Sequence, residues 1–272
     1  MRHALTLWIF VVLAAGFPIS QAVAQTDPRT AEEFDRFRAI MEEANPAELF
    51  EVKGEELWKK KRGPKNASLE QCDLGLGPGV VKGAYVQLPR YFADTGKVMD
   101  AEQRVVHCMI TLQGFSYAAL AKRPFSRGSY TPDPVAIVTY IAAQSKGMKI
   151  AVRQSHPKEL ENYEVGREIF FYRAGPWDFS CASCHGQDNL RIRTQPLPNF
   201  TQPEQAARSF MGWPGYRMTG GVMHTLQWRL TDCFRQQRFP YLSYVSDTHT
   251  ALLTYLGVNA NGHEYRGPGI KR

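Results

Sequence analysis

Two cysteines and a histidine stand at a fixed spacing in the second half of the chain, in the run Cys181-Ala182-Ser183-Cys184-His185. Cys-x-x-Cys-His is the sequence to which haem c is attached: both thiols add to vinyl groups of the porphyrin, and the imidazole binds the iron. A thioredoxin-like redox pair or half of a zinc site uses the same cysteine spacing. A redox pair does not need the histidine, and a zinc site needs a second ligand pair, which this sequence lacks. The motif therefore predicts one covalently bound haem c.

The N-terminus has the pattern of a secretory signal peptide. Arg2 precedes an apolar block from Ala4 to Gly16, and the small residues Ala22 and Ala24 mark a cleavage site. The apolar block is shorter than the roughly 20 residues that span a bilayer. We therefore predict a cleaved signal peptide over residues 1–24 and no membrane anchor. Because haem c is attached outside the bacterial cytoplasm, both motifs predict a periplasmic protein.

Composition limits the classes of partner. The chain has 272 residues, 43% of them hydrophobic, which suffices for one large core or two of ordinary size. Its formal net charge of +7 is a modest excess that favours anionic partners. The sequence shows no basic stripe with interleaved aromatic residues, so we predict no binding to nucleic acid.

The chain also repeats itself, with a period of roughly 115 residues. Landmarks recur in the same order in both halves: Gly54 and Gly166 in helical patterns, Gly63-Pro64 and Gly175-Pro176, residues 88–91 and 197–200, residues 104–108 and 229–233, and residues 136–141 and 251–256. Each copy has the order of a cytochrome c domain, with a first and a last helix and irregular loops between them. The repeat predicts a mainly α fold of two tandem cytochrome c-like domains, residues 26–150 and 151–272.

The copies differ at the haem motif. We align the second copy's Cys181–His185 with residues 72–76 of the first, which places Gly75 and Leu76 where the second thiol and the histidine would stand. A porphyrin cannot be attached there in the usual way. The first domain is therefore predicted to be without haem.

Five cysteines are present, and haem attachment uses Cys181 and Cys184. Two of the others, Cys72 and Cys108, flank the place in the first domain where a porphyrin would lie if that domain had kept its haem. In an oxidising compartment, two free thiols at these positions would most simply form a disulfide with each other. We therefore predict a Cys72–Cys108 disulfide. Cys233 then remains without a partner.

Cys233 is the leading candidate for the second axial ligand of the haem iron. Its repeat mate, Cys108, lies where a distal ligand would lie if the first domain had kept its haem. Other side chains of the same region compete for this position, namely Met211, Met218, Met223, His224 and His249.

The run around Cys233 reads as a helix on which Arg229 lies four residues earlier, on the same face. A guanidinium there would favour the thiolate form of Cys233. It would also offer paired donors to a small oxyanion, such as a sulfur oxyacid. Arg235 and Arg238 are predicted to be solvated. Since Arg104 occupies the same position in the first copy, a structural role for Arg229 stays open.

Taken together, these features resemble the SoxA family, the subunit of the SoxAX cytochrome that acts as an L-cysteine S-thiosulfotransferase in bacterial thiosulfate oxidation. The resemblance covers the mature chain, and it is to the subclass whose first domain has lost its haem. It implies that His185 and Cys233 are the axial ligands, that Cys233, often a persulfide, is catalytic, and that Arg229 binds thiosulfate.

The same resemblance implies the reaction and the partners. Thiosulfate would be joined oxidatively to a cysteine of the carrier protein SoxYZ, and two electrons would pass through haem to the subunit SoxX, in a heterodimer, and then to a soluble cytochrome c. The alternative is a monohaem electron-transfer cytochrome whose first domain docks partners. A methionine ligand and an unreactive Cys233 would favour that alternative.

Overall fold

The computed structural model describes residues 43–122, 124, 130–192 and 195–271, together with residues 33, 36, 40 and 41. The predicted signal peptide, residues 1–24, lies outside the described residues. The described part is rich in helices and has three small sheets, of two, two and three strands. None of its helices is long and apolar enough to cross a membrane.

Both halves of the chain lie within one compact unit, residues 41–272. The first half contains α2 (Ala47–Lys59), η1 (Tyr85–Gln87), β1 (Arg90–Phe92), β2 (Lys97–Met99), α3 (Ala101–Thr111), α4 (Tyr117–Leu120) and α5 (Asp133–Ala143). The second half contains α6 (Pro157–Phe171), α7 (Cys181–His185), β3 (Arg191–Ile192), β4 (Gln195–Pro196), α8 (Pro203–Phe210), β5 (Gly215–Arg217), β6 (Val222–His224), α9 (Leu226–Gln236), α10 (Asp247–Asn259) and β7 (Gly269–Lys271).

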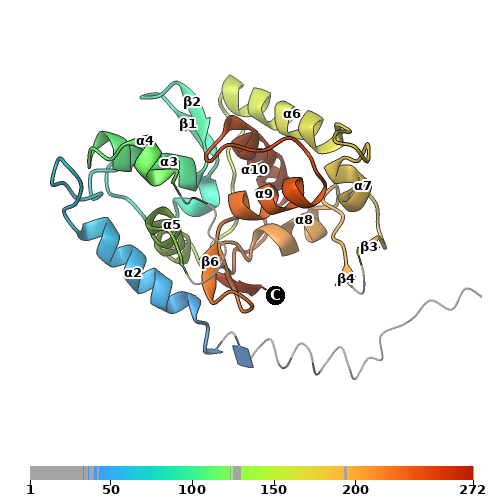
Figure 1. Cartoon of the computed structure of the whole chain (residues 1–272), viewed down its shortest axis with the longest axis horizontal. Coiled ribbons are helices and arrows are strands. Elements are labelled where there is room, and N and C mark those ends of the chain that lie inside the picture. Colours follow the sequence, from blue (N-terminus) through green and yellow to red (C-terminus); the bar gives the residue numbers. More distant parts are fainter. Residues whose placement is uncertain are drawn as a thin grey trace, which may run out of the picture. The chain divides into compact units, whose positions relative to one another are not determined.

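In each half the first and last helices pack together across a glycine. Helix α2 runs beside α5, and α6 runs beside α10 (Figure 1). A Cβ atom at Gly54 would collide with the carbonyl oxygen of Ala136, and one at Gly166 would collide with that of Ala251. Only glycine permits this close approach of two helix backbones. The two glycines of the sequence repeat therefore mark the same helix crossing.

A hairpin followed by a capped helix also recurs. In the first half a cis Leu88-Pro89 bond precedes the β1–β2 hairpin, and the Asp100 side chain then caps α3. In the second half a cis Trp213-Pro214 bond precedes β5 and β6, and Thr225 caps α9. The pairing of residues 88–91 with residues 197–200 is therefore wrong. A tryptophan in place of leucine hides the true counterpart, residues 213–216.

The loops before the Cys-x-x-Cys-His turn and before its counterpart in the first half align without insertions or deletions. Isolated bridges join Arg62 to Ala67 and Ala174 to Phe179, and the residues just before the ends of these bridges, Asn66 and Asp178, both have positive φ. Continued without a gap, this register pairs Ser68 with Ser180. The alignment of the motif is corrected accordingly: Leu69, Cys72 and Asp73 correspond to Cys181, Cys184 and His185.

The two halves meet at the N-termini of α3 and α9. The Gln227 side chain of α9 donates to the Asp100 carboxylate at 2.6 Å, and the Tyr244 hydroxyl donates to Glu102 at 2.9 Å. All four side chains are buried, and Asp100, Glu102 and Gln227 line a cavity of about 30 Å³. Burial is the largest cause that raises the pKa of Glu102, to about 8.

The C-terminal strand completes the third sheet. β7 pairs in parallel with β5, whose other edge pairs antiparallel with β6. Lys271 is the register partner of Arg217 in this arrangement. The end of the chain is thereby fixed next to the hairpin that precedes α9.

Candidate functional site

A cavity of about 340 Å³ lies in the second half, with residues of α7 and α9 in its wall. Most of the lining side chains are apolar, including Phe170, Phe200, Phe210, Leu230, Phe234 and Leu252. The groups that can do chemistry are fewer and are Cys181, Cys184, His185, Arg208, Arg229, Cys233 and Lys271. A large apolar cavity with a few reactive or charged groups is the usual form of a cofactor site.

The Cys-x-x-Cys-His motif forms the short helix α7. Ser180 caps this helix by accepting a hydrogen bond from the Ser183 backbone N–H, and the Ser183 hydroxyl in turn accepts one from the Ser180 backbone N–H. Both cysteines and the histidine of this turn line the cavity. Burial raises the pKa of Cys181 to about 12 and also raises the pKa of Cys184.

His185 is held in one tautomer. Its Nδ1 lies 2.9 Å from the carbonyl oxygen of Pro198, which can only accept, so Nδ1 carries the proton. The ring is also stacked on Phe200, with ring centroids 4.3 Å apart. Burial, followed by the positive charge of Arg229, lowers the pKa of His185 against the opposing hydrogen bond. The neutral ring keeps Nε2 as the atom available to a metal.

Helix α9 carries the other two predicted site residues. It begins at Leu226, after the Thr225 cap, so the predicted helix around Cys233 is confirmed. Arg229 and Cys233, one turn apart, both line the cavity. The structure therefore brings together all five residues that the sequence predicts for the second domain.

The protonation of Cys233 depends on opposing causes. Burial is the largest and raises the pKa of the thiol, Asp232 raises it further, and Arg229 lowers it. The predicted direction of the Arg229 effect is correct, but burial outweighs it. Stable thiolate character would need the contact with a metal ion, which deprotonates a thiol outright.

Asp232 is a neighbour of the site that the sequence analysis missed. Its carboxylate lies 3.3 Å from Arg229 and 2.7 Å from Arg235. The Arg229 side chain is still 37% exposed. The signal was present in the sequence, since an acid three residues after an arginine on a helix forms such a pair. Arg235, predicted to be solvated, is exposed, but Asp232 engages it.

The competing ligands lie elsewhere. Met218 is exposed, and Met223 packs in a small cluster with Ala47 and Val135. His224 stacks on Trp228, and His249 is buried with its ring nitrogens bonded to Thr231 and Ser246. The described residues that line the cavity include no methionine, so Met211 is also absent from its wall.

The residues present fit a haem c. Two thiols stand at the attachment spacing, an imidazole offers Nε2, and a further thiol reaches the same apolar cavity from α9. The described part of the chain has no group of three His, Cys, Asp or Glu side chains that could hold a metal ion by itself.

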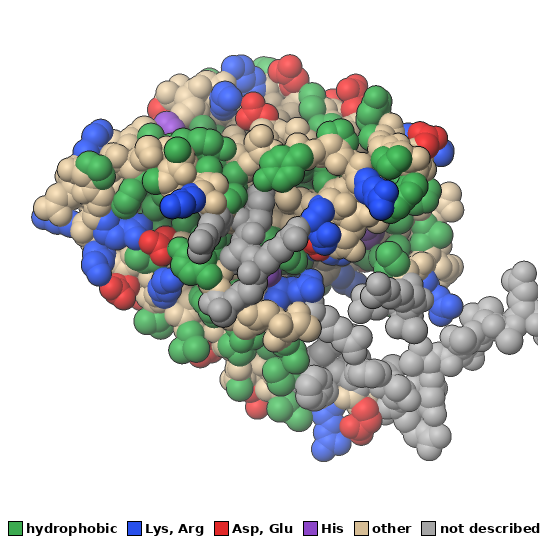
Figure 2. Space-filling view, viewed as in Figure 1, with side chains coloured by type: hydrophobic (Ala, Val, Ile, Leu, Met, Phe, Trp, Pro, Cys, Tyr) green, Lys and Arg blue, Asp and Glu red, His purple; other side chains and the backbone are tan. Residues whose placement is uncertain are grey.

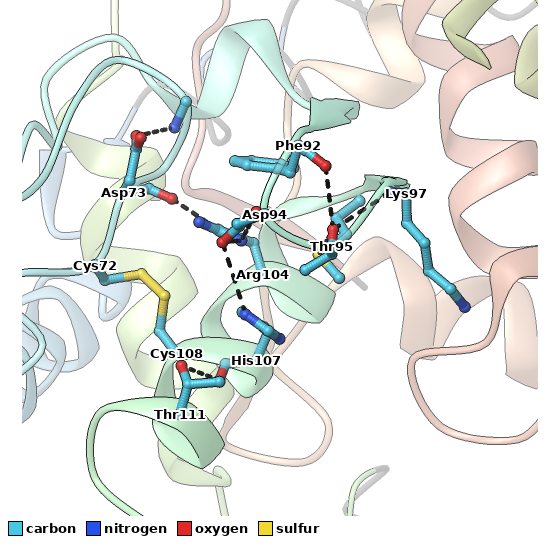
Figure 3. A network of polar contacts seen from close by, with 12 residues as sticks. Cys72, Asp73, Phe92, Asp94, Thr95, Lys97, Arg104, His107, Cys108 and Thr111 are labelled. Carbon is cyan, nitrogen blue, oxygen red and sulfur yellow. Dashed lines mark hydrogen bonds and ion pairs between the residues drawn. A yellow bond between two sulfur atoms is a disulfide. The ribbon is translucent and has the colours of Figure 1, made fainter.

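In the first half the predicted Cys72–Cys108 disulfide is confirmed. Figure 3 shows the disulfide beside Arg104, the repeat mate of Arg229. Arg104 donates from Nε to the Asp73 carbonyl oxygen at 2.7 Å and pairs with the Asp94 carboxylate at 2.8 Å. Its guanidinium also lies 4.1 Å from the centroid of the Phe92 ring.

Both the sequence and the fold are similar to those of known proteins. The family described as "SoxA/TsdA, cytochrome c domain" matches residues 53–150, in the half without the Cys-x-x-Cys-His motif. The L-cysteine S-thiosulfotransferase subunit SoxA of Hydrogenophilus thermoluteolus is 50% identical over 259 residues, covering 93% of this chain and 94% of that protein. The subunit of the same name from Hydrogenobacter thermophilus is 31% identical over 98% of this chain and 99% of that protein.

A solved structure is also similar. The crystal structure of SoxXA from P. pantotrophus superimposes with a TM-score of 0.70 and 27% sequence identity. The match covers 87% of this chain and 84% of that chain. The described fold is therefore the cytochrome c-like fold found in that complex.

Proposed function

The chain belongs to the SoxA family of L-cysteine S-thiosulfotransferase subunits, and we propose that it holds one haem c in its second half and joins thiosulfate to a cysteine of the carrier protein SoxYZ. One observation carries this proposal. The Cys-x-x-Cys-His turn, Arg229 and Cys233 line a single apolar cavity.

The proposed organisation is two tandem cytochrome c-like domains, residues 26–150 without haem and residues 151–272 with haem. Recurrence of the glycine helix crossing, of the hairpin after a cis proline and of the capped helix supports two copies of one domain. In the first copy Leu69 and Asp73 replace a thiol and the imidazole, and the disulfide consumes the two cysteines.

Four side chains would hold the cofactor. Cys181 and Cys184 would form the thioether bonds, and His185 and Cys233 would bind the iron. When bound, the haem supplies a route by which two electrons leave the site. The Pro198 carbonyl supports the His185 role, since it holds the proton on Nδ1 and leaves Nε2 free for a metal.

Arg229 would bind and orient the substrate. In the overall reaction a sulfur–sulfur bond forms between the carrier's cysteine and the outer sulfur of thiosulfate. The cysteine proton and two electrons are released. Arg229 lines the cavity with Cys233 one turn away, so its guanidinium can hold the anionic oxygens of thiosulfate while the outer sulfur faces Cys233. Cys233 is then the catalytic sulfur, as a thiolate or as a persulfide.

The proposed setting is the periplasm, after removal of residues 1–24. The partner subunit would be SoxX, since the similar solved structure is a SoxXA complex, and a soluble cytochrome c would accept the electrons. Figure 2 shows Lys and Arg side chains scattered over the visible face of the molecule rather than gathered in one stripe.

An intact-protein mass spectrum of the periplasmic heterodimer, recorded before and after mild reduction with a phosphine, is the first test. We expect a chain beginning after Ala24, one haem, and two hydrogens fewer for the disulfide. Any extra sulfur that the phosphine removes should map to Cys233.

The activity test follows on the same preparation. Thiosulfate and the reduced carrier are incubated with oxidised cytochrome c, and the mass of the carrier and the reduction of the cytochrome are measured together. Cys233→Ser should abolish both. A variant that lacks the disulfide, Cys72→Ser with Cys108→Ser, should keep both. Full turnover by Cys233→Ser would show that Cys233 is not the catalytic sulfur. A wild-type protein that transfers nothing to the carrier would leave a simple electron-transfer cytochrome as the better description.

A further inference from the structure

The hairpin before each of the two equivalent helices supplies the neighbours of the helix arginine. In the first half, strand β1 ends at Phe92, whose ring lies under the Arg104 guanidinium, and the turn supplies Asp94, which pairs with it. Only 5% of the Arg104 side chain is exposed. These contacts, together with the bond to the Asp73 carbonyl (Figure 3), pair the Arg104 guanidinium within the protein and bury it.

The second half has different residues at those two hairpin positions. Counting from the cis proline, Arg217 at the end of β5 stands where Phe92 stands, and Thr219 in the turn stands where Asp94 stands. An arginine, Arg217, therefore occupies in the second half the position of the aromatic Phe92. The uncharged Thr219 occupies the position of Asp94, the acid that pairs with Arg104.

Several contacts place Arg217 beside Arg229. Its guanidinium lies 5.3 Å from the ring centroid of Trp228, the residue that precedes Arg229 on α9. His224 stacks on the same ring, with centroids 3.7 Å apart, and fixes its orientation. The charge of Arg229, after burial, lowers the pKa of Arg217, and Asp232 opposes this. Among the described residues, the Arg217 side chain makes no hydrogen bond or ion pair.

A third cation lies next to Arg217. Lys271 of β7 is its register partner in the parallel pair β5–β7, so the two residues lie side by side on adjacent strands. Lys271 also lines the cavity, as Arg229 does. Lys271 and Arg229 therefore bring positive charge to the cavity from β7 and α9, and Arg217 of β5 lies beside both residues.

The acid next to Arg229 is already shared with other side chains. Asp232 pairs with Arg229 and Arg235 and accepts a further hydrogen bond from Gln236. Two guanidiniums held close together repel each other, and an anion bound between them relieves that repulsion. The first half has no such repulsion, because Phe92 stands in place of the second arginine and Asp94 pairs with Arg104. In the second half the repulsion between Arg217 and Arg229 remains.

We propose that Arg217 is a second anion-binding residue, which together with Arg229 holds the sulfonate end of the thiosulfate dianion at the edge of the cavity. The inference rests on the proposed function and adds a residue to it. Two guanidiniums match the two charges of the dianion and offer several donors to its oxygens. With the sulfonate fixed in this way, the outer sulfur points toward Cys233.

The test replaces Arg217 by the residue that the first half has at this position. Arg217→Phe keeps an apolar contact with Trp228 and removes the charge, and Arg217→Lys keeps the charge and removes the paired donors. Thiosulfate binding to the holo heterodimer is measured by calorimetry, and KM and kcat are measured with the carrier. We expect Arg217→Phe to weaken binding and to raise KM about tenfold, with kcat changed less than threefold. Arg217→Lys should lie between this variant and the wild type.

Arg167→Gln is the matched control, because it removes one positive charge from an exposed ion pair on α6. A structural role of Arg217 would instead lower the melting temperature or change the haem absorption spectrum. Wild-type affinity and KM in both Arg217 variants would overturn the inference, and Arg217→Lys alone decides it if Arg217→Phe does not fold. If the wild type binds thiosulfate but transfers nothing to the carrier, the proposed function fails while calorimetry still tests Arg217.

Discussion

Helix α3 carries an arginine and a cysteine four residues apart, and α9 carries the same pair at the same distance from its N-cap. In α3 the arginine is paired with Asp94 and the cysteine is in a disulfide. In α9 the arginine pairs with Asp232 on its own helix but is still 37% exposed, against 5% for Arg104, and the cysteine is free. The neighbouring elements, rather than the Arg-x-x-x-Cys pattern, therefore decide whether the pair is structural or chemical.

The volume next to the Arg-x-x-x-Cys helix is filled by side chains in the first half and is a cavity in the second half. In the first half Leu69, Leu74 and the disulfide fill the core and are almost completely buried. In the second half the corresponding space is a cavity lined by Cys181 and Cys184. Side chains thus fill in the first half the volume that is a cavity, the proposed haem site, in the second half.

The largest effect should come from removing the sulfur of Cys233. Cys233→Ser removes the proposed catalytic sulfur, so we expect thiosulfate conjugation to fall by about 10³-fold or more. The melting temperature should change little, because Cys233 makes no disulfide. Conjugation is followed by the mass of the carrier, and unfolding by circular dichroism. A conjugation rate above one tenth of the wild-type value would show that the sulfur of Cys233 is dispensable.

The second prediction concerns the cysteines of the first half. Replacing Cys72 and Cys108 by serine opens a link between residues 36 positions apart. By the loop-entropy relation this should lower the free energy of unfolding by roughly 3 to 4 kcal/mol. Denaturant unfolding of the holoprotein measures the loss, and the KM for thiosulfate should stay at the wild-type value. A raised KM without a loss of stability would contradict the division of roles between the halves.

Much of this comparison could be predicted from the sequence. The haem motif, the disulfide and the glycines of the helix crossings depend on residue types whose chemistry or shape allows few alternatives. The Arg229–Cys233 pair followed from helical spacing alone. Each of these inferences used residues close together in the chain, or a repeat that kept its register.

The rest depended on contacts between distant segments. Arg104 is neutralised by Asp94 across a hairpin, and nothing in the spacing of the two residues predicts that contact. The counterpart of the segment that begins at Leu88 was missed because tryptophan replaces the leucine at 213 and glycine replaces the arginine at 215, which leaves only the proline and the tyrosine in common. The buried acids between the halves were also missed, since Glu102 reads as an exposed position in the first turn of a helix.

A third prediction uses those acids, at a position where the halves differ by one charge: Glu102 of α3 corresponds to Gln227 of α9. Burial raises the pKa of Glu102 to about 8 from the usual 4.5, so the folded state binds more protons than the unfolded state between these values. Stability should therefore be full below about pH 4 and should fall as pH rises toward 8, by on the order of 4 kcal/mol.

Glu102→Gln makes the two positions alike and should remove this part of the pH dependence. Denaturant unfolding of the variant and the wild type from pH 5 to pH 9 measures the difference, and Asp100 contributes to both proteins. At pH 8 the variant should be the more stable protein. Glu56→Gln, which changes an exposed carboxylate on α2, is the control. Parallel curves for Glu102→Gln and the wild type would mean that Glu102 is ionised in the folded state.

The smallest expected effect comes from placing an acid at position 219, which corresponds to Asp94 of the first half. Thr219 is exposed in the β5–β6 turn, where the first half has Asp94, so Thr219→Asp should not disturb the fold. The new carboxylate can pair with Arg229 as Asp94 pairs with Arg104. Because a partly exposed ion pair contributes at most about 1 kcal/mol, we expect the KM for thiosulfate to rise about three- to fivefold. Thr219→Asn, of the same shape without the charge, should leave KM unchanged.

The reverse change tests the same comparison from the other side. Asp94→Thr leaves the buried Arg104 guanidinium without its carboxylate, and should lower stability while KM stays constant. Added salt should weaken the Thr219→Asp effect, since it screens an exposed pair. If Thr219→Asp and Thr219→Asn raise KM equally, the turn affects the substrate through its shape. If only the aspartate does so, the charge balance around one arginine is what separates the binding half of this chain from the structural half.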